Sequence, residues 1–302
     1  MALSREESPE YSPTADDVID VSSTPIKAEV VDEGALRQFP FWPLVLFLAT
    51  CYTTTTVGEA EYPGQGWLYS MPVMAILLCH EFGHYLQARR YRVPASLPYF
   101  IPVPFPPLGT MGAVIGMRSN SWNRKELFDI GISGPLAGLV PAIVFCVVGL
   151  RLSSVVDVPP VIKQQMVGAP LLFRWLAEWI LHPPAGTLID LHPIAYAGWV
   201  GIFITALNLM PISQLDGGHV LYALLRRKAH IVASLLLAFA IVAVLLTQNY
   251  QWSLMLFLLL LIGPNHPPTA NDHVPLGTGR TILGWVTLAF VIIGFTPTPF
   301  SG

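Results

Sequence analysis

The segment His80-Glu81-Phe82-Gly83-His84 has the residue types and the spacing that a hydrolytic metal site requires. Residues i and i+4 of a helix share one face, so both imidazoles can reach the same ion. A carboxylate beside such a pair can act as the general base that takes a proton from the attacking water. We therefore expect His80 and His84 to be metal ligands and Glu81 to be catalytic.

The surroundings of this motif are apolar, and this makes its polar residues informative. The helix that carries it is expected at about residues 67–87 and includes the apolar run from Met71 to Cys79. Ionisable groups inside a membrane are costly and mark functional sites. The 302-residue chain is 53% hydrophobic and only 12% charged, whereas soluble domains have about 25% charged residues. We interpret the chain as an integral membrane protein.

A catalytic zinc ion takes three protein ligands and keeps one position open, so the two histidines need a partner. The stretch 208–219 offers Asp216 among apolar neighbours. If this stretch is helical, the ten residues to Arg226 place the carboxylate about 15 Å deep. Without a cation it would be protonated or destabilising there. Pro211 is expected to break the helix before it.

Seven apolar runs predict the fold class, an all-α polytopic membrane protein with six to seven transmembrane helices. A helix needs about 20 residues to cross a bilayer core of about 30 Å, and the sixth run is shorter, so we leave its crossing open. A further segment, residues 171–180, reads as an amphipathic helix on the outer surface. The apolar runs cover about residues 39–57, 67–87, 127–150, 194–211, 231–247, 252–263 and 281–295.

The distribution of Lys and Arg predicts an orientation. If the N-terminus is cytoplasmic and all seven runs cross, 13 of these residues lie on the cytoplasmic side and three on the other, as the positive-inside rule favours. Residues 1–37 carry nine acidic and three basic residues, which indicates a disordered acidic cytoplasmic tail over residues 1–38. The tail lacks the basic start and apolar core of a signal peptide, and import signals are poor in acidic residues. We therefore expect a bacterial inner membrane.

The connection between the second and third helices differs from an ordinary loop. Residues 94–107 contain six prolines separated by apolar side chains, so this stretch must be extended and not helical. The following segment, Met111 to Arg118, is a candidate strand. We expect a membrane-embedded β-hairpin or extended loop that the surrounding protein shields from lipid. A buried structural loop and a substrate-binding element both remain open on these residues alone.

The two metal motifs together resemble the site-2 protease family (M50-type), intramembrane zinc metalloproteases. The resemblance rests on His80 to His84 combined with the N-x-x-P-x-x-x-L-D-G stretch from Asn208 to Gly217. The third helix adds Ser133 to Gly138, similar to a G-P-containing segment of the family. The proline-rich stretch followed by Gly109 to Ala113 resembles the branch with chloroplast and many bacterial members. The similarity covers about residues 67–230 of an expected transmembrane domain at 39–297.

The resemblance implies roles for five residues and one Zn²⁺ per chain. His80, His84 and Asp216 match the zinc ligands, Glu81 matches the general base, and Asn208 matches a position thought to stabilise the oxyanion. The implied function is an intramembrane zinc endopeptidase, in which water activated by zinc hydrolyses peptide bonds in or near transmembrane segments.

The resemblance also implies a substrate and partners. Residues 97–118 match a membrane-embedded sheet thought to hold substrate, and its candidate binding residues are Gly112, Ala113, Val114 and Ile115. The expected partners are the lipid bilayer and a single-span membrane protein, often cut first by a site-1-type protease, and nucleic acid is not expected. The chain departs from some relatives because residues 151–193 are too few for a PDZ domain and no CBS domain follows the last helix.

Two other function classes agree less well with the sequence. A metal transporter would require several carboxylates or histidines along a path, and the sequence offers one cluster. A non-proteolytic relative would be expected to lose Glu81 or a ligand, and none is lost.

Several other polar residues have structural interpretations. Asp129 is expected to pair with Arg124 or Lys125. His219 either supports the metal site or is satisfied by backbone, and His266 is expected in a loop.

The three cysteines, Cys51, Cys79 and Cys146, lie in apolar runs without a C-x-x-C spacing. They indicate neither a disulfide framework nor a thiolate metal site. Cys79 is expected in the core.

Overall fold

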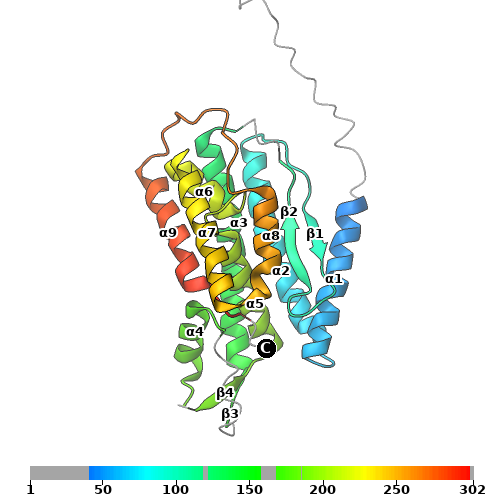
Figure 1. Cartoon of the computed structure of the whole chain (residues 1–302). Coiled ribbons are helices and arrows are strands. Elements are labelled where there is room, and N and C mark those ends of the chain that lie inside the picture. The colour runs from blue at the N-terminus through cyan, green and yellow to red at the C-terminus, as the bar shows by residue number, and fades with distance from the viewer. Residues whose placement is uncertain (1–40, 118–121, 158–167, 185, 300–302) are drawn as a thin grey trace, which may run out of the picture. The chain divides into compact units, whose positions relative to one another are not determined.

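The computed structural model describes residues 41–117, 122–157, 168–184 and 186–299, and the expected acidic tail lies outside them. The described part is mostly helical (Figure 1). Its helices are α1 (Phe41–Glu61), α2 (Gly66–Arg90), α3 (Arg124–Leu152), α4 (Leu171–Leu181), α5 (Pro193–Asn208), α6 (Asp216–Leu225), α7 (Lys228–Thr247), α8 (Ser253–Ile262) and α9 (Thr278–Gly294). A 3₁₀ turn at Tyr250–Trp252 precedes α8.

Three of these helices, α1, α3 and α7, are long and apolar enough to cross a membrane. The length and composition of these helices therefore indicate that the chain is a membrane protein. The apolar helices α5 and α9 are shorter, and so is the stretch Tyr250–Ile262 that contains α8. At 1.5 Å per residue the ten residues of α8 rise only about 15 Å, which agrees with the reservation about the sixth apolar run.

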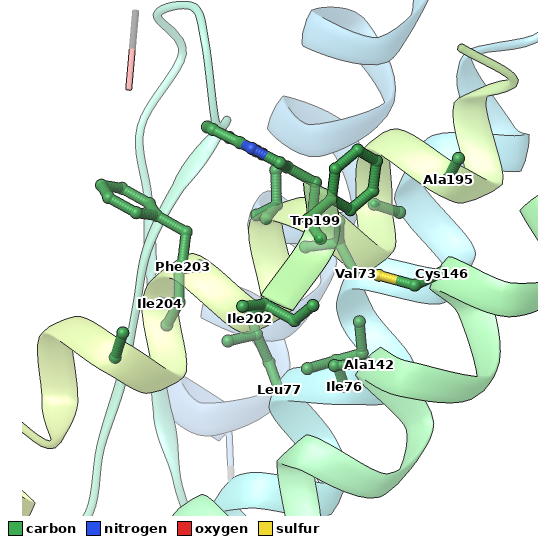
Figure 2. Close-up of a cluster of buried hydrophobic side chains, with 14 of the residues drawn as sticks. Val73, Ile76, Leu77, Ala142, Cys146, Ala195, Trp199, Ile202, Phe203 and Ile204 are labelled. Atoms are coloured by element: carbon green, nitrogen blue, oxygen red, sulfur yellow. The ribbon is translucent and has the colours of Figure 1, made fainter. Parts of the chain in front are cut away.

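The core that supports the site is formed by α2, α3 and α5. Side chains from all three helices point toward one another (Figure 2), among them Val73, Ala142 and Ile202, each at most 1% exposed. Glycines allow this close packing, because a Cβ at Gly149 would lie 2.1 Å from the backbone nitrogen of Ala195. Since burial of apolar surface does not drive association inside lipid, such small-residue contacts are the usual means of packing membrane helices.

A β-hairpin connects α2 to α3, as the proline-rich sequence predicts. Its strands β1 (Tyr99–Pro102) and β2 (Thr110–Val114) are antiparallel and form a two-stranded sheet. The hairpin lies between α1 and α2, with β1 packed on α1 and β2 nearer α2 (Figure 1).

The turn of this hairpin is held by hydroxyl groups from three helices. Thr53 of α1 donates to the carbonyl of residue 109 at 2.7 Å, Tyr69 of α2 donates to that of residue 108 at 2.8 Å, and Tyr196 of α5 donates to that of residue 107 at 3.3 Å. Tyr69 lies in the first turn of α2, whereas the hairpin leaves the opposite end of α2, after Arg90. The hairpin therefore runs back along about 30 Å of helix.

A second two-stranded sheet was not predicted from the sequence. Strands β3 (Ser154–Asp157) and β4 (Thr187–Asp190) pair antiparallel between α3 and α5. The intervening α4 confirms a helix at the segment predicted to be amphipathic: it buries Phe173 against its neighbours and leaves Trp175 and Trp179 exposed. Its position on the outer surface stays a prediction. The strands were missed because each has only four residues and neither is buried.

The prediction for Asp129 was wrong. Its carboxylate binds Arg280 of α9 at 2.7 and 2.8 Å and accepts a hydrogen bond from Tyr91. Arg124 instead donates to the carbonyls of residues 223 and 224 at the end of α6. This pairing satisfies carbonyls that the last turn of a helix leaves free, and local sequence spacing contains no sign of it.

Candidate metal centre

Helix α2 places the two motif histidines on one buried face. His80 is 3% exposed and His84 is 6% exposed, and their Nε2 atoms lie 3.2 Å apart. The i, i+4 spacing thus gives the shared face that the sequence predicts.

The ring of His84 is oriented by the neighbouring helix. Its Nδ1 atom lies 2.8 Å from the carbonyl oxygen of Ile130 in α3. A carbonyl can only accept, so Nδ1 carries the proton and Nε2, on the side of His80, keeps its lone pair. Metal-binding histidines typically donate their second ring nitrogen to a carboxylate or carbonyl in this way.

Glycines of α3 provide the space for both rings. A Cβ at Gly134 would lie 2.0 Å from Nε2 of His84, and a Cβ at Gly138 would lie 3.0 Å from Cβ of His80. Gly83 of α2 faces the same helix, and a Cβ added to Gly83 would lie 2.6 Å from the carbonyl oxygen of Ser133. The small residues of α3, predicted to serve packing, therefore pack directly against the metal-site imidazoles.

A break between α5 and α6 brings a carboxylate to the histidines. Helix α5 ends at Asn208 and α6 begins at Asp216, as the position of Pro211 predicts. The connecting segment folds back tightly on α6. A Cβ at Gly217 would lie 1.9 Å from the carbonyl oxygen of Leu209, so this position excludes a side chain.

The Asp216 carboxylate completes a compact donor group. Its two oxygens lie 3.1 Å from Nε2 of His80 and 3.3 Å from Nε2 of His84. One ligand atom from each of the three residues can be chosen so that all lie within 4.8 Å of one another, and no other such group of His, Cys, Asp or Glu occurs in the described part of the chain. Two imidazoles and one carboxylate are a donor set of catalytic zinc sites, and these three residues fit such an ion.

The two predicted catalytic residues lie at the same place. Glu81 is 4% exposed and interacts electrostatically with His80, His84 and Asp216. The side-chain nitrogen of Asn208 lies 3.4 Å from Nε2 of His80. All five residues that the sequence analysis selected for catalysis and metal binding therefore meet at one point.

The predicted substrate residues lie on or next to β2. Gly112, Ala113 and Val114 belong to the strand, and Ile115 follows its last residue. One edge of β2 pairs with β1, and its other edge has no strand partner among the described residues.

The contact between His219 and His266 was not predicted from the sequence. Nδ1 of His219 lies 2.6 Å from Nε2 of His266, whose Nδ1 donates to the carbonyl of Pro267. Burial lowers the pKa of His266 to about 4, so its ring is neutral at neutral pH. His266 does lie in a loop, as predicted. Its 47-residue separation from His219 left no local signal of the contact.

One cysteine prediction is corrected. Cys146 is buried, but Cys79 is exposed on α2, so it is not a core residue. The side chain of Cys79 points away from His80 around α2, toward the outer surface of this helix.

Comparisons with known proteins agree with the geometry. Residues 68–247 match the family model described as "Peptidase family M50". The chain is 31% identical over 233 residues to "Probable zinc metalloprotease EGY1, chloroplastic" of Arabidopsis thaliana, covering 74% of this chain and 42% of that protein. It is 33% identical to the protein of the same name from Oryza sativa subsp. japonica, covering 74% and 39%.

A third relative, "Probable zinc metalloprotease EGY2, chloroplastic" of Oryza sativa subsp. indica, is 28% identical, covering 82% of this chain and 45% of that protein. The chain thus spans about two fifths of the length of these curated relatives. No solved structure gives a significant match. The family match over more than half of the sequence, on the segment that carries all three candidate ligands, shows that the chain belongs to peptidase family M50.

Proposed function

We propose that this protein is a zinc endopeptidase that hydrolyses peptide bonds in or near the transmembrane segments of other membrane proteins. The observation that carries this proposal is the buried His80–His84–Asp216 group with Glu81 beside it. A purely structural zinc site would be closed by four protein ligands. Here three donors converge next to a carboxylate that is not among them, which favours hydrolysis.

Each residue has a chemical task in this proposal. His80, His84 and Asp216 would hold one Zn²⁺, which when bound acts as a Lewis acid and lowers the pKa of water. Glu81 takes the proton of the attacking water and later delivers it to the leaving amine. Asn208 donates a hydrogen bond to the oxygen that becomes negatively charged in the transition state.

The free edge of β2 supports a role in substrate binding. A helical substrate satisfies its own peptide groups and hides the bond to be cut, so it must unwind. An extended segment can be held by pairing with an exposed strand edge, and Gly112 to Ile115 supply that edge. The proposed substrate is a single-span membrane protein within the bilayer, after a first cut by another protease.

We further propose that the domain at 39–297 crosses the membrane six to seven times, with the hairpin embedded. The turn of the hairpin lies at the start of α2 and its open end at the other end of α2. If α2 crosses the bilayer, the hairpin enters it to a similar depth. Helix α1, packed on β1, would shield that side of the hairpin from lipid, and the unpaired edge of β2 would be left for substrate.

The ends of α2, α6 and α7 that carry Arg and Lys would face the cytoplasm or its equivalent, with the acidic tail on the same side. The named relatives are chloroplastic, so the bacterial inner membrane remains a prediction without support from them. Localisation of a tagged full-length chain in its source cells tests it.

The proposed function can be tested by cleavage of a single-span substrate in liposomes by wild type and Glu81→Gln, with zinc measured in both. We expect both to bind about one zinc and only the wild type to cleave. Removal of zinc with a chelator should abolish cleavage, and zinc addition should restore it. Zinc binding without cleavage of any of several substrates with weakened helices would contradict the protease proposal.

A further inference from the structure

The backbone groups of β2 face two sides, and the hydrogen bonds of the hairpin show which residues face which side. In an extended strand the N–H and C=O of one residue point to one side, and those of the next residue point to the other. One side of β2 is turned toward β1, and the other has no strand partner in the described part of the chain. The residues on this second side can be identified from the contacts of their neighbours.

Gly116 fixes the alternation at the open end of the hairpin. Its C=O accepts a hydrogen bond from the backbone nitrogen of Ser96 at 2.9 Å, and its N–H donates to the hydroxyl oxygen of Ser96, also at 2.9 Å. Both backbone groups of Gly116 are therefore turned toward the segment that leads into β1. By alternation, Val114 is turned the same way and Ile115 between them is turned outward.

Thr110 fixes the alternation at the other end of β2. This residue is 1% exposed, and its hydroxyl donates to the C=O of Ile101 in β1 at 3.1 Å and accepts from the N–H of Gly112 at 3.0 Å. The register of the two strands shifts at this place, and φ of Gly112 is 89°, a region that favours glycine. The arrangement is a β-bulge, which re-aims the residues that follow it. Gly112 is turned toward β1.

Ala113 and Ile115 are the residues that remain. Val114 forms the hydrogen-bonded pair with Tyr99, so Ala113 forms the non-hydrogen-bonded pair with Phe100 and directs its N–H and C=O away from β1. In the described part of the chain, no loop or helix backbone bonds to the backbone of Ala113 or Ile115 on this side. Both residues are partly exposed. Their N–H and C=O groups, two residues apart, are therefore free to bind another chain.

Free backbone groups inside a bilayer require a partner. Lipid tails offer neither donors nor acceptors, so a hairpin embedded as proposed cannot turn these groups toward hydrocarbon. Val114 and Ile115 line a cavity of about 360 Å³, which has room for roughly twelve waters at about 30 Å³ each. Water can satisfy the free groups when no substrate is bound, and an extended chain can replace this water.

We propose that the substrate backbone pairs with Ala113 and Ile115, and not with Gly112 or Val114, and that Thr110 is the positioning residue that fixes this choice. The inference rests on the proposed function, because it names the groups that hold the substrate at the same site. A chain that pairs with two such residues uses N–H groups that are also two residues apart. The substrate segment therefore needs a free N–H at two alternate positions, and proline is excluded from both.

The first test locates the substrate groups without catalysis. Full-length Glu81→Gln in liposomes is titrated with synthetic single-span substrates in which one backbone amide at a time is replaced by an ester, which removes one N–H. We expect two positions, two residues apart, to lose about fivefold in affinity each, the effect of one hydrogen bond. Esters in the parts that stay helical should not weaken binding, because they weaken the helix equally in the free and the bound substrate.

The second test changes the proposed edge. In the Glu81→Gln background, Ile115→Pro removes one outward N–H, and an edge strand tolerates proline where the N–H faces away from the partner strand. Affinity for the unmodified substrate should fall about fivefold. The matched control, Ile115→Ala, shortens the side chain further but keeps the N–H, so it should bind within about twofold of the parent.

The third test concerns Thr110. Thr110→Val keeps the shape of the side chain and removes the hydroxyl that holds the bulge. One of the two ester-sensitive positions should disappear, because Ala113 adjoins the bulge, whereas Ile115 is still held in place by Gly116. Thr110→Ser keeps the hydroxyl and should keep both positions. A role in stability alone would leave the pattern of ester-sensitive positions unchanged.

These tests separate the two proposals. Two alternate sensitive positions without cleavage by the wild type would refute the proteolytic function and retain the edge. A flat ester profile, sensitive positions that are adjacent, or equal binding by Ile115→Pro and Ile115→Ala overturns the edge, whether or not the wild type cleaves. An ester pattern that survives Thr110→Val removes Thr110 from the proposal.

Discussion

The substitution Gly134→Ala should remove zinc without adding or removing any polar group. An alanine Cβ at this position would lie 2.0 Å from Nε2, 2.4 Å from Cδ2 and 2.5 Å from Cε1 of His84. Ordinary contact begins at 3.4 Å, so the ring or α3 must move by about 1.4 Å. Zinc–nitrogen bonds are about 2.0–2.1 Å long, and in a functional zinc site each bond stays within about 0.2 Å of this length. The required movement is therefore several times larger than the tolerance.

The ring of His84 cannot adapt freely to this movement. It lies against α3 and is held by its hydrogen bond to Ile130 at 2.8 Å. Loss of partners that only orient a ligand typically lowers metal affinity by about 10–100-fold. Since Gly134→Ala displaces the ligand atom itself, we expect a loss at or above the upper end of this range, with cleavage lost in parallel.

The assay is zinc content by mass spectrometry after dialysis against graded chelator, together with thermal unfolding. Gly279→Ala in α9 is the control, because nothing lies within 4 Å of its Cβ, and it should keep wild-type zinc. Gly138→Ala should be intermediate, since its contact with His80 is 3.0 Å. If folded Gly134→Ala binds zinc and cleaves like the wild type, the arrangement of α2 on α3 described here is wrong.

Three further predictions concern the ligand, the hairpin and the α3–α9 contact. Asp216→Asn should lower zinc affinity by at least about tenfold, measured by chelator competition; unchanged affinity would exclude Asp216 as a ligand. Tyr69→Phe removes one of the three hydrogen bonds that hold the hairpin turn, so the substrate KM should rise about fivefold, as for about 1 kcal/mol, with zinc content constant. A shift in zinc content instead would mean that Tyr69 supports the metal site. Arg280→Ala breaks the two-pronged contact with Asp129 and should destabilise the protein by about 1 kcal/mol, a modest value because the arginine is partly exposed. Thermal unfolding measures it, and an unchanged midpoint would show that the ion pair contributes nothing.

The sequence predicted those parts of the molecule that depend on local spacing. The face shared by His80 and His84 follows from helix geometry, and the break before Asp216 follows from Pro211. The extended course of residues 94–107 follows from prolines that exclude a helix, and the second strand follows from the candidate strand that begins at Met111. Asp216 was selected because a lone carboxylate at that depth needs a cation.

Other features depend on contacts between distant segments and could not be read locally. The partner of Asp129 is 151 residues away, and an equally good partner stood five residues away in the sequence. The pairing of His219 with His266 likewise appears only when the loop after α8 is placed. Cys79 was assigned to the core from its apolar neighbours, but a membrane helix is apolar on its outer face as well.

The anchoring of the hairpin turn to three helices has a consequence for how substrates are selected. A strand fixed in this way cannot change its shape to fit the substrate, so the substrate segment must unwind to pair with it. Strand β2 has five residues, which corresponds to about 17 Å of extended chain and to about one and a half turns of helix. Under the proposed function, the rate of cleavage depends on the free energy needed to unwind the short segment of the substrate helix that pairs with β2. The protein would then select substrates by the local stability of their transmembrane helix. Single-span proteins with a glycine or a pair of β-branched residues at the depth of β2 would be cut before proteins whose helix is stable along its whole length.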